Sequence, residues 1–452
     1  MKYIKLSFLM FSTALLATPE VTTLAEVFSE AKTSGNIKYY YIQTDKKFAN
    51  TADTSANAHS VGGQLKFDTA SLNGFSGGAT FMTTNPFLLN THVDTSIIGR
   101  DNGVRLGSGA SGSDAQKGFS VLGEVYLAYT FSDFTLKLGR EVLKTPLIDA
   151  KEVRMLPSAV EGMFGRYLGL NKKLKVEVEY LTKFKQRTSD TFTNIVEHAL
   201  GSKTKAVTGS DTGYILMGGL EYKNDLYSVK GYDYYAKDFL YSLYVDGSYK
   251  LKLADTITTL SAQYIFQTSI GNADKNLAQV GSLTGEKNIN ANAFGFKAET
   301  SLANSKFLVA YTKVLKDDNK HDSLVLPWDG TPLYSDMITS NNLFQSNYGK
   351  SLNADGNYIG GSAGIKIAYL QKYDGFGLEG ISTNFSYLNI SNARFTKNQH
   401  DYNAVIAYKY DKKLSVAVKG IWVKNNTSAT EVGNITQLQQ LSQYRVIANY
   451  KF

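Results

Sequence analysis

The sequence predicts an all-β fold, a closed antiparallel transmembrane β-barrel of about eighteen strands. Three observations lead to this prediction: segments of about ten residues alternate apolar with polar side chains, short turns alternate with long connections, and proline is absent from the predicted strands. The mean hydropathy of −0.22 excludes a bundle of transmembrane helices. The chain has 452 residues and no Cys, so disulfides, thiolate metal sites and a Cys nucleophile are also excluded.

The first residues have the features of a secretory signal peptide rather than of a transmembrane helix. Lys2 and Lys5 give a positive start, an apolar run follows, and small residues come next. We expect residues 1–17 to be this signal peptide, with cleavage after Ala17; cleavage after Ala25 is the alternative. The formal net charge is +8, but export and the scattering of the basic residues argue against nucleic acid as a partner.

The mature chain is expected to begin with a periplasmic N-terminal segment, residues 18–34, that contains a short amphipathic helix over Thr23–Lys32. The transmembrane barrel is expected over residues 35–452. Its strands are predicted near residues 35–45, 60–70, 74–84, 119–131, 134–141, 160–170, 173–186, 212–222, 226–235, 239–251, 255–270, 290–301, 305–315, 358–372, 376–390, 401–410, 413–424 and 441–452.

The connections between these segments alternate in length. Two-residue turns such as Ser132–Asp133 and Asn224–Asp225 alternate with links as long as residues 316–357, and only Ala236–Asp238 breaks the pattern by being short. Short periplasmic turns and longer external loops are the layout of an outer-membrane barrel. Proline falls in the long links or before the first strand, as expected where a missing N–H could not be replaced by water.

The last predicted strand carries apolar and aromatic residues on one face: Tyr444, Val446, Ala448, Tyr450 and Phe452. An alternating strand that ends in an aromatic residue is similar to the signal read by the bacterial barrel-assembly machinery. That machinery is therefore an expected partner, bound through Phe452. The alternative is an ordinary edge strand that happens to end in Phe.

A barrel of about eighteen strands encloses a water-filled channel, because only barrels of about eight strands are filled by their own side chains. Outer-membrane lipids are expected on the outer face and small polar solutes in the channel. Too few residues precede the first strand to form a plug domain. Something must narrow the channel, and only a loop folded inward can do so.

The stretch 123–190 shows a strand, a short turn, a strand with Lys-x-Gly, and a proline-containing loop that closes with Arg-x-Leu-Pro. The positions are Lys137, Gly139, Pro146, Arg154, Leu156 and Pro157, followed by Thr182, Lys183 and Ser189–Asp190. This stretch resembles the OprD family of bacterial outer-membrane porins. The resemblance implies an eighteen-stranded barrel, monomeric or assembled as a homotrimer, whose third external loop, residues 142–159, bends into the pore.

The resemblance also implies a row of basic side chains on the channel wall, facing acidic groups and carbonyls of the inward loop. From strand alternation, the candidates for this basic row are Lys38, Lys66, Lys137, Lys183, Lys185, Lys366, Lys419 and Arg445. The expected constriction residues on the loop are Asp149, Glu152 and Arg154. The chain departs from the family in favouring Lys over Arg, and acids also fall on the inner face: Glu177, Glu179 and Glu299.

These features predict a porin of the bacterial outer membrane that passes small polar solutes, with selectivity for carboxylate-bearing molecules such as amino acids or organic acids. The alternative is an outer-membrane adhesin or structural barrel. An enzyme is not expected, because the Gly-x-Ser-x-Gly segments around Ser76 and Ser362 fit glycine-rich strand starts better than nucleophile elbows. The five His are expected in loops without metal-site spacing, so neither a metal nor a cofactor is expected.

Overall fold

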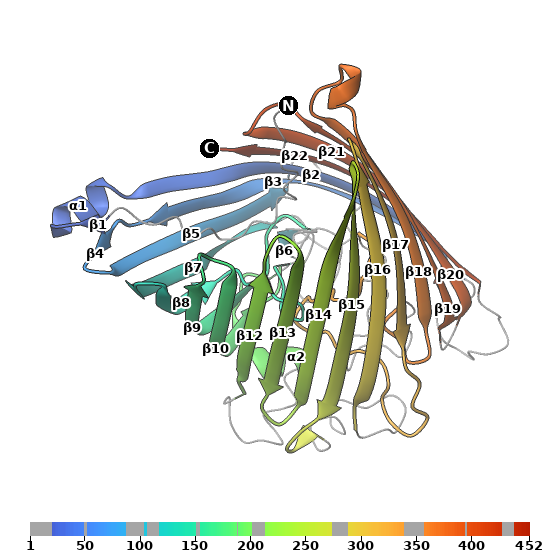
Figure 1. The fold of residues 1–452 in the computed structure, drawn as a ribbon. Helices are drawn as coiled ribbons and strands as arrows, with labels where there is room; N and C mark the ends of the chain where they lie inside the picture. Colours follow the sequence, from blue (N-terminus) through green and yellow to red (C-terminus); the bar gives the residue numbers. More distant parts are fainter. Residues whose placement is uncertain are drawn as a thin grey trace.

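The computed structural model describes residues 20–48, 52–86, 104–105, 117–150, 154–187, 189–200, 213–273, 288–338, 357–393, 396–426 and 438–452. Eighteen strands form one closed antiparallel barrel, as predicted (Figure 1). They are β2 (Lys32–Phe48), β3 (Thr54–Asp68), β5 (Phe75–Pro86), β7 (Lys117–Phe131), β8 (Phe134–Glu141), β9 (Ala159–Gly169), β10 (Leu174–Lys185), β12 (Ile215–Lys223), β13 (Tyr227–Ala236), β14 (Leu240–Leu253), β15 (Thr256–Ser269), β16 (Asn290–Leu302), β17 (Ser305–Val314), β18 (Ala363–Lys372), β19 (Ile381–Ala393), β20 (Thr396–Lys409), β21 (Leu414–Asn426) and β22 (Leu438–Lys451). The ring closes where β22 pairs with β2, which sets Tyr39 opposite Ala448.

The remaining elements are short: β1 (Glu20–Val21), β4 (Ser71–Leu72), β6 (Val104–Arg105), β11 (Thr193–Asn194), α1 (Leu24–Ser29), α2 (Ile195–Leu200) and the 3₁₀ helix η3 (Asp374–Phe376). Within the described ranges, no helix is long and apolar enough to cross a membrane. The barrel strands fall at the predicted places to within a few residues. The first one begins at Lys32, so the end of the expected periplasmic segment already belongs to the barrel.

The two faces of each strand differ as a membrane barrel requires. In β17 the side chains of Phe307 and Val309 are 52% and 51% exposed on the outer face, whereas Ala310, the residue after Val309, is buried. Each of the eighteen barrel strands pairs with a neighbour on both sides, so the backbone hydrogen bonds are satisfied within the ring. Apolar side chains can therefore face lipid while polar ones face the channel.

The tight turns at one end of the barrel use backbone conformations that suit two-residue hairpins. Asn73, Ser132, Ala254 and Ala303 all have positive φ, between 46° and 51°. Such turns match the right-handed twist of the paired strands. In the turn before β21, the backbone N–H groups of Leu414 and Lys413 donate to the Asp411 carboxylate at 2.6 and 2.7 Å, and these bonds lower the pKa of Asp411.

Helix α1 forms where the sequence predicts a helix, and a capping box explains where it starts. The Glu26 N–H donates to Thr23 Oγ1 at 3.3 Å, and the Thr23 N–H donates to Glu26 Oε2 at 3.2 Å. Backbone donors from Thr22 and Thr23 also lower the pKa of Glu26. Val27 is buried against the base of the barrel, where its carbonyl accepts from the Ala70 N–H.

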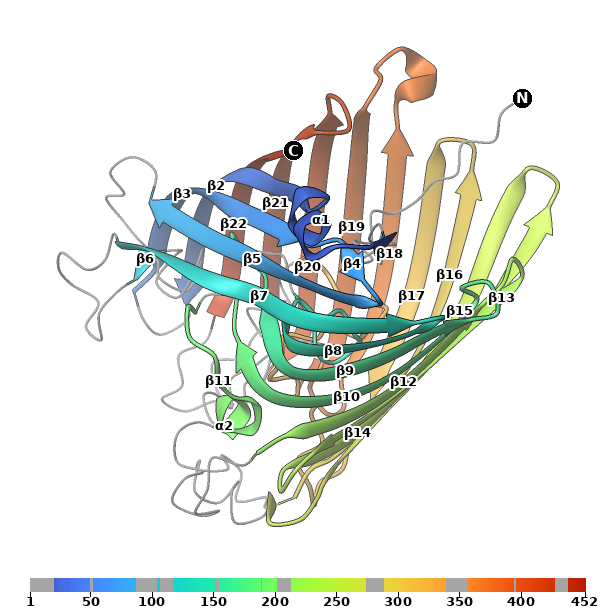
Figure 2. The same ribbon diagram turned by 90° about the vertical axis from the view of Figure 1, so that its left-hand side faces the viewer.

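The wall is lower on one side of the barrel. Strands β8 and β12 have 8 and 9 residues, whereas β2 has 17. Figure 2 looks onto the side that contains β7 to β10, with β18 to β20 behind it. The external loops that follow β8 and β10 begin from this low wall and so have room to turn into the barrel.

Candidate functional site

The third external loop, which follows β8, crosses the inside of the barrel. The Leu147 N–H donates to the Tyr234 hydroxyl of β13 at 3.3 Å, and the Met155 carbonyl accepts from Lys38 Nζ of β2 at 3.0 Å. In the ring of eighteen, β2 is the first strand and β13 the ninth, so the loop touches opposite walls. Leu147 and Met155 are both buried. The expected inward folding of this loop is confirmed.

A second inward loop, between β17 and β18, is absent from the sequence prediction. Two glutamines on the inner face of β15 hold its backbone. Gln267 Nε2 donates to the Val325 carbonyl at 2.9 Å, and the Val325 N–H donates back to Gln267 Oε1 at 2.7 Å. In the same way, Gln263 donates to the Pro332 carbonyl at 3.0 Å and accepts from the Tyr334 N–H at 2.9 Å.

A third segment, after β10, joins the two loops around Asp329. The Ser158 hydroxyl donates to Asp329 Oδ2 at 2.5 Å, and Arg187 forms an ion pair with the same carboxylate. One residue earlier, Trp328 Nε1 donates to the Ile195 carbonyl at the start of α2, at 2.9 Å. Both Asp329 and Trp328 are buried. Three loops therefore meet as one packed layer inside the barrel.

A basic cluster lies on the inner face of three adjacent strands, β21, β22 and β2. We define it as Lys38, Lys419 and Arg445. Lys419 lies directly opposite Arg445 in the strand register. The Arg445 guanidinium donates to Gln443 Oε1 at 2.8 and 2.7 Å, and Lys38 reaches the Met155 carbonyl of the third loop. Arg154, one of the expected constriction residues, precedes Met155 and is buried.

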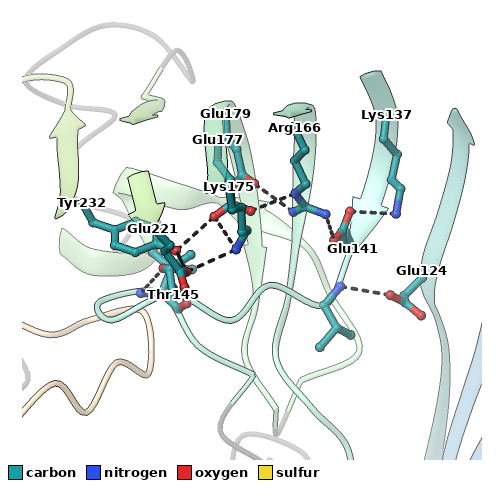
Figure 3. Close-up of polar contacts among 12 residues, drawn as sticks. Glu124, Lys137, Glu141, Thr145, Arg166, Lys175, Glu177, Glu179, Glu221 and Tyr232 are labelled. Atoms are coloured by element: carbon teal, nitrogen blue, oxygen red, sulfur yellow. Dashed lines mark hydrogen bonds and ion pairs between the residues drawn. The ribbon is translucent and has the colours of Figure 1, made fainter. Parts of the chain in front are cut away.

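An acid-rich cluster lies on the inner face of β7 to β12 (Figure 3). Its members are Glu124, Glu141, Glu177, Glu179 and Glu221 with Lys137, Arg166 and Lys175. Arg166 is central: its Nη1 lies 2.5 Å from Glu141 Oε1 and its Nε lies 3.0 Å from Glu177 Oε1. Its Nη2 lies 2.9 Å from Glu179 Oε1. The five acids exceed the three bases by two charges.

The other ions of this cluster tie it to the third loop. Lys137 Nζ lies 3.0 Å from Glu141 Oε2, and Lys175 Nζ lies 2.7 Å from Glu177 Oε2. The Glu124 carboxylate accepts from the Val142 N–H, where the loop leaves β8, at 3.2 Å. Lys137 was expected on the inner wall and lies there, but as part of an acid-rich group.

One expected residue of the basic row lies on the wrong face. A β-bulge between Leu181 and Lys183 inserts one extra residue into β10 and reverses the alternation beyond it. Lys183 is 45% exposed on the outer face, where its Nζ lies 2.6 Å from Glu161. Arg140 binds the same carboxylate at 2.8 Å. Lys183 is therefore not a channel residue.

The remaining predicted residues are dispersed. Lys66 forms an ion pair with Asp68 at 3.3 Å near the end of β3. Lys185 is fully buried and donates to the Pro157 carbonyl at 2.9 Å, and Lys366 donates to the Asp336 carbonyl of the second inward loop at 2.5 Å.

The other two expected constriction residues are Asp149 and Glu152. The Asp149 N–H donates to the Trp328 carbonyl at 3.1 Å, which places Asp149 in the layer of inward loops. Glu152 lies outside the described residues. His59 and His400 were expected in loops but belong to β3 and β20.

A closed barrel that faces lipid outside, with charged walls and folded loops inside, defines a channel of the outer-membrane porin class. Residues 26–452 match the model of the outer membrane porin, OprD family. The chain therefore belongs to the OprD family of porins of the bacterial outer membrane.

Solved structures share this fold. OpdK of Pseudomonas aeruginosa with vanillate is 15% identical, with 94% of this chain and 99% of that chain covered and a TM-score of 0.70. OccK2 (OpdF) of the same organism, in complex with glucuronate, is 14% identical over 94% and 99%, with a TM-score of 0.67. OccAB1 of Acinetobacter baumannii is 16% identical over 94% and 97%, with a TM-score of 0.71. A comparison with the curated proteins finds no match.

Proposed function

We propose that this porin passes small carboxylate-bearing solutes, such as amino acids or organic acids, past a constriction between the basic cluster and the acid-rich cluster. The observation that carries the proposal is the convergence of Lys38, Lys419 and Arg445 on three adjacent strands beside the loop residue Arg154. The narrowest part of the channel would be lined by Arg154, Asp149 and Glu152. Two structural neighbours were solved with vanillate and glucuronate, both of which carry a carboxylate.

The charge separation supports a role in solute selection. A charge in a narrow channel with low-dielectric walls acts more strongly than the same charge in bulk water. The basic cluster offers a carboxylate several weak positions in succession, and weak multiple sites allow both entry and release. An adhesin or structural barrel, the alternative reading of the sequence, has no need for clusters of opposite charge on different parts of the channel wall.

Two further expectations remain proposals. Phe452 pairs with Gly35 of β2 through two backbone hydrogen bonds of 3.1 Å, so the C-terminal aromatic residue helps to close the ring. Its recognition by the barrel-assembly machinery, and assembly into a homotrimer, are proposed on the sequence alone. The predicted signal peptide, residues 1–17, lies outside the described residues.

The test compares two lysines on opposite faces of the wall. Lys419→Gln removes a charge from the channel, whereas Lys183→Gln removes the same charge from the outer face. Reversal potentials are measured on the full-length protein in planar bilayers. One measurement uses a gradient of potassium chloride, and the other a gradient of potassium glucuronate. We expect Lys419→Gln to shift selectivity toward cations at low salt, with a smaller shift at high salt because of screening.

Lys183→Gln should behave as the wild type in both salts. Equal reversal potentials for Lys419→Gln and the wild type at low salt would show that the basic cluster does not select the solute.

A further inference from the structure

A second charged surface lies outside the channel, on the outer wall formed by β20, β21, β22 and β2. Lys47 of β2 and Lys424 of β21 both lie opposite Gln440 of β22 in the strand register. Strands are spaced about 4.8 Å apart, so the two lysine backbones are roughly 10 Å apart. Lys47 and Lys424 are exposed and share the outer face with Ile37 and Val418, respectively. All three residues lie near the ends of their strands, away from the short turns.

The two lysines differ from two other basic residues of the outer wall, Arg140 and Lys183. Arg140 and Lys183 both bind Glu161. Within the part of the chain that the structure describes, Lys47 and Lys424 have no ion-pair partner. The nearby acid on the same face, Asp45, already accepts from Gln43 Nε2 at 2.9 Å and from the Ser55 hydroxyl at 2.6 Å. The patch therefore carries positive charge toward its surroundings.

Aromatic residues frame this patch at the depth of a membrane interface. Trp422, two residues before Lys424, donates through Nε1 to the Tyr444 hydroxyl at 3.2 Å. On the other side, His400 lies opposite Lys424, and its Nδ1 is 2.9 Å from the Tyr387 hydroxyl. Belts of Trp and Tyr mark the level of lipid headgroups in barrel proteins. Lipid phosphates lie at that level, next to the two ammonium groups.

We propose that Lys47, Gln440 and Lys424 form a binding site for the phosphate group of an outer-leaflet lipid. The two ammonium groups supply the charge, and the Gln440 amide between them supplies a neutral hydrogen-bond donor. A basic residue close to an anionic membrane surface contributes enough for a several-fold gain in affinity, so two should contribute roughly tenfold to thirtyfold. This site is independent of the channel and goes beyond the transport function proposed above.

The test removes the positive charges of Lys47 and Lys424 and measures how much lipid A stays bound. The full-length wild type and a Lys47→Ala/Lys424→Ala variant are placed in phosphatidylcholine nanodiscs that contain bisphosphorylated lipid A. Native mass spectrometry then measures lipid A that stays bound. The matched control, Lys172→Ala/Lys412→Ala, removes two exposed lysines from the short turns at the other end of the barrel. We expect a loss of about tenfold or more in the first variant and none in the control.

Two further measurements test whether the phosphate group of the lipid is what the site binds. Lipid A without phosphate should bind the wild type as weakly as bisphosphorylated lipid A binds the alanine variant, and Lys47→Arg/Lys424→Arg should restore binding. Equal retention by the wild type and the alanine variant would overturn the proposal. So would undiminished binding of the dephosphorylated lipid, or complete displacement of lipid A by millimolar inorganic phosphate, which would make free phosphate the ligand.

Discussion

Two arginines on different parts of the inner wall have opposite surroundings. Arg166 is bound by three carboxylates, those of Glu141, Glu177 and Glu179. Arg445 is more deeply buried, at 1% exposure, and it forms hydrogen bonds with the Gln443 amide oxygen and the Tyr40 side chain. One guanidinium is thus surrounded by excess negative charge, whereas the other donates to a neutral amide oxygen and lies opposite the cationic Lys419.

The difference separates a structural role from a functional one. In the acid-rich cluster Arg166 pairs with three carboxylates, and the cluster also anchors the start of the third loop through Glu124. Its charges are fixed within the wall. In the basic cluster Lys419 has no ion-pair partner within the described residues, so positive charge remains to act on a passing solute. The same residue type therefore stabilises one wall and is expected to select solutes at the other.

The largest expected effect comes from breaking the acid-rich cluster. Arg166→Met leaves three buried carboxylates without their shared cation. Removal of one partner from a buried ion network costs about 3–5 kcal/mol. The free energy of unfolding in detergent, measured by guanidinium titration, should fall by that amount. Lys66→Met is the control, because its ion pair with Asp68 is partly exposed and such pairs contribute about 0–1 kcal/mol. Equal losses would show that the cluster adds nothing to stability.

An intermediate effect is expected from freeing the second inward loop. Gln263→Leu/Gln267→Leu removes the four hydrogen bonds that attach residues 325–334 to β15. A hydrogen bond contributes about 1 kcal/mol, which is enough to release a loop locally without unfolding the barrel. Single-channel conductance should rise and backbone amides of the loop should exchange faster.

Gln371→Leu is the matched control for this loop, because Gln371 contacts Ser305 near the short turns instead. Unchanged conductance in the double variant would show that the loop does not narrow the channel.

The sequence predicted what local alternation encodes, and missed what depends on distant contacts. All strands followed from two-residue periodicity, and the turns from residues such as Asn73 and Ser132 that tolerate positive φ. The second inward loop depends on glutamine side chains far away along the chain, which no local pattern reports. Its apolar run, Leu324–Trp328, was an available signal, since such a run is unusual in a solvent-exposed loop.

The wrong prediction that Lys183 lies on the inner face has a different cause. A β-bulge adds a single residue and inverts every side chain beyond it. Alternation alone gives no sign of that insertion, so parity placed Lys183 on the wrong face.

We expect Arg445→Gln to have the smallest effect on stability. This change is also the most direct test of the comparison between Arg166 and Arg445. After this change glutamine can still donate to Gln443 Oε1. The loss should therefore be about 1 kcal/mol, close to that of a single hydrogen bond. Selectivity should change more: the reversal potential should move toward cations at low salt, and current carried by glucuronate should fall. Arg166→Gln, the matched change in the acid-rich cluster, should show the opposite pattern, with a large loss of stability and no shift toward cations. If Arg445→Gln instead destabilises the barrel as much as Arg166→Gln and leaves the reversal potential unmoved, both arginines are structural and the basic cluster does not act on the solute.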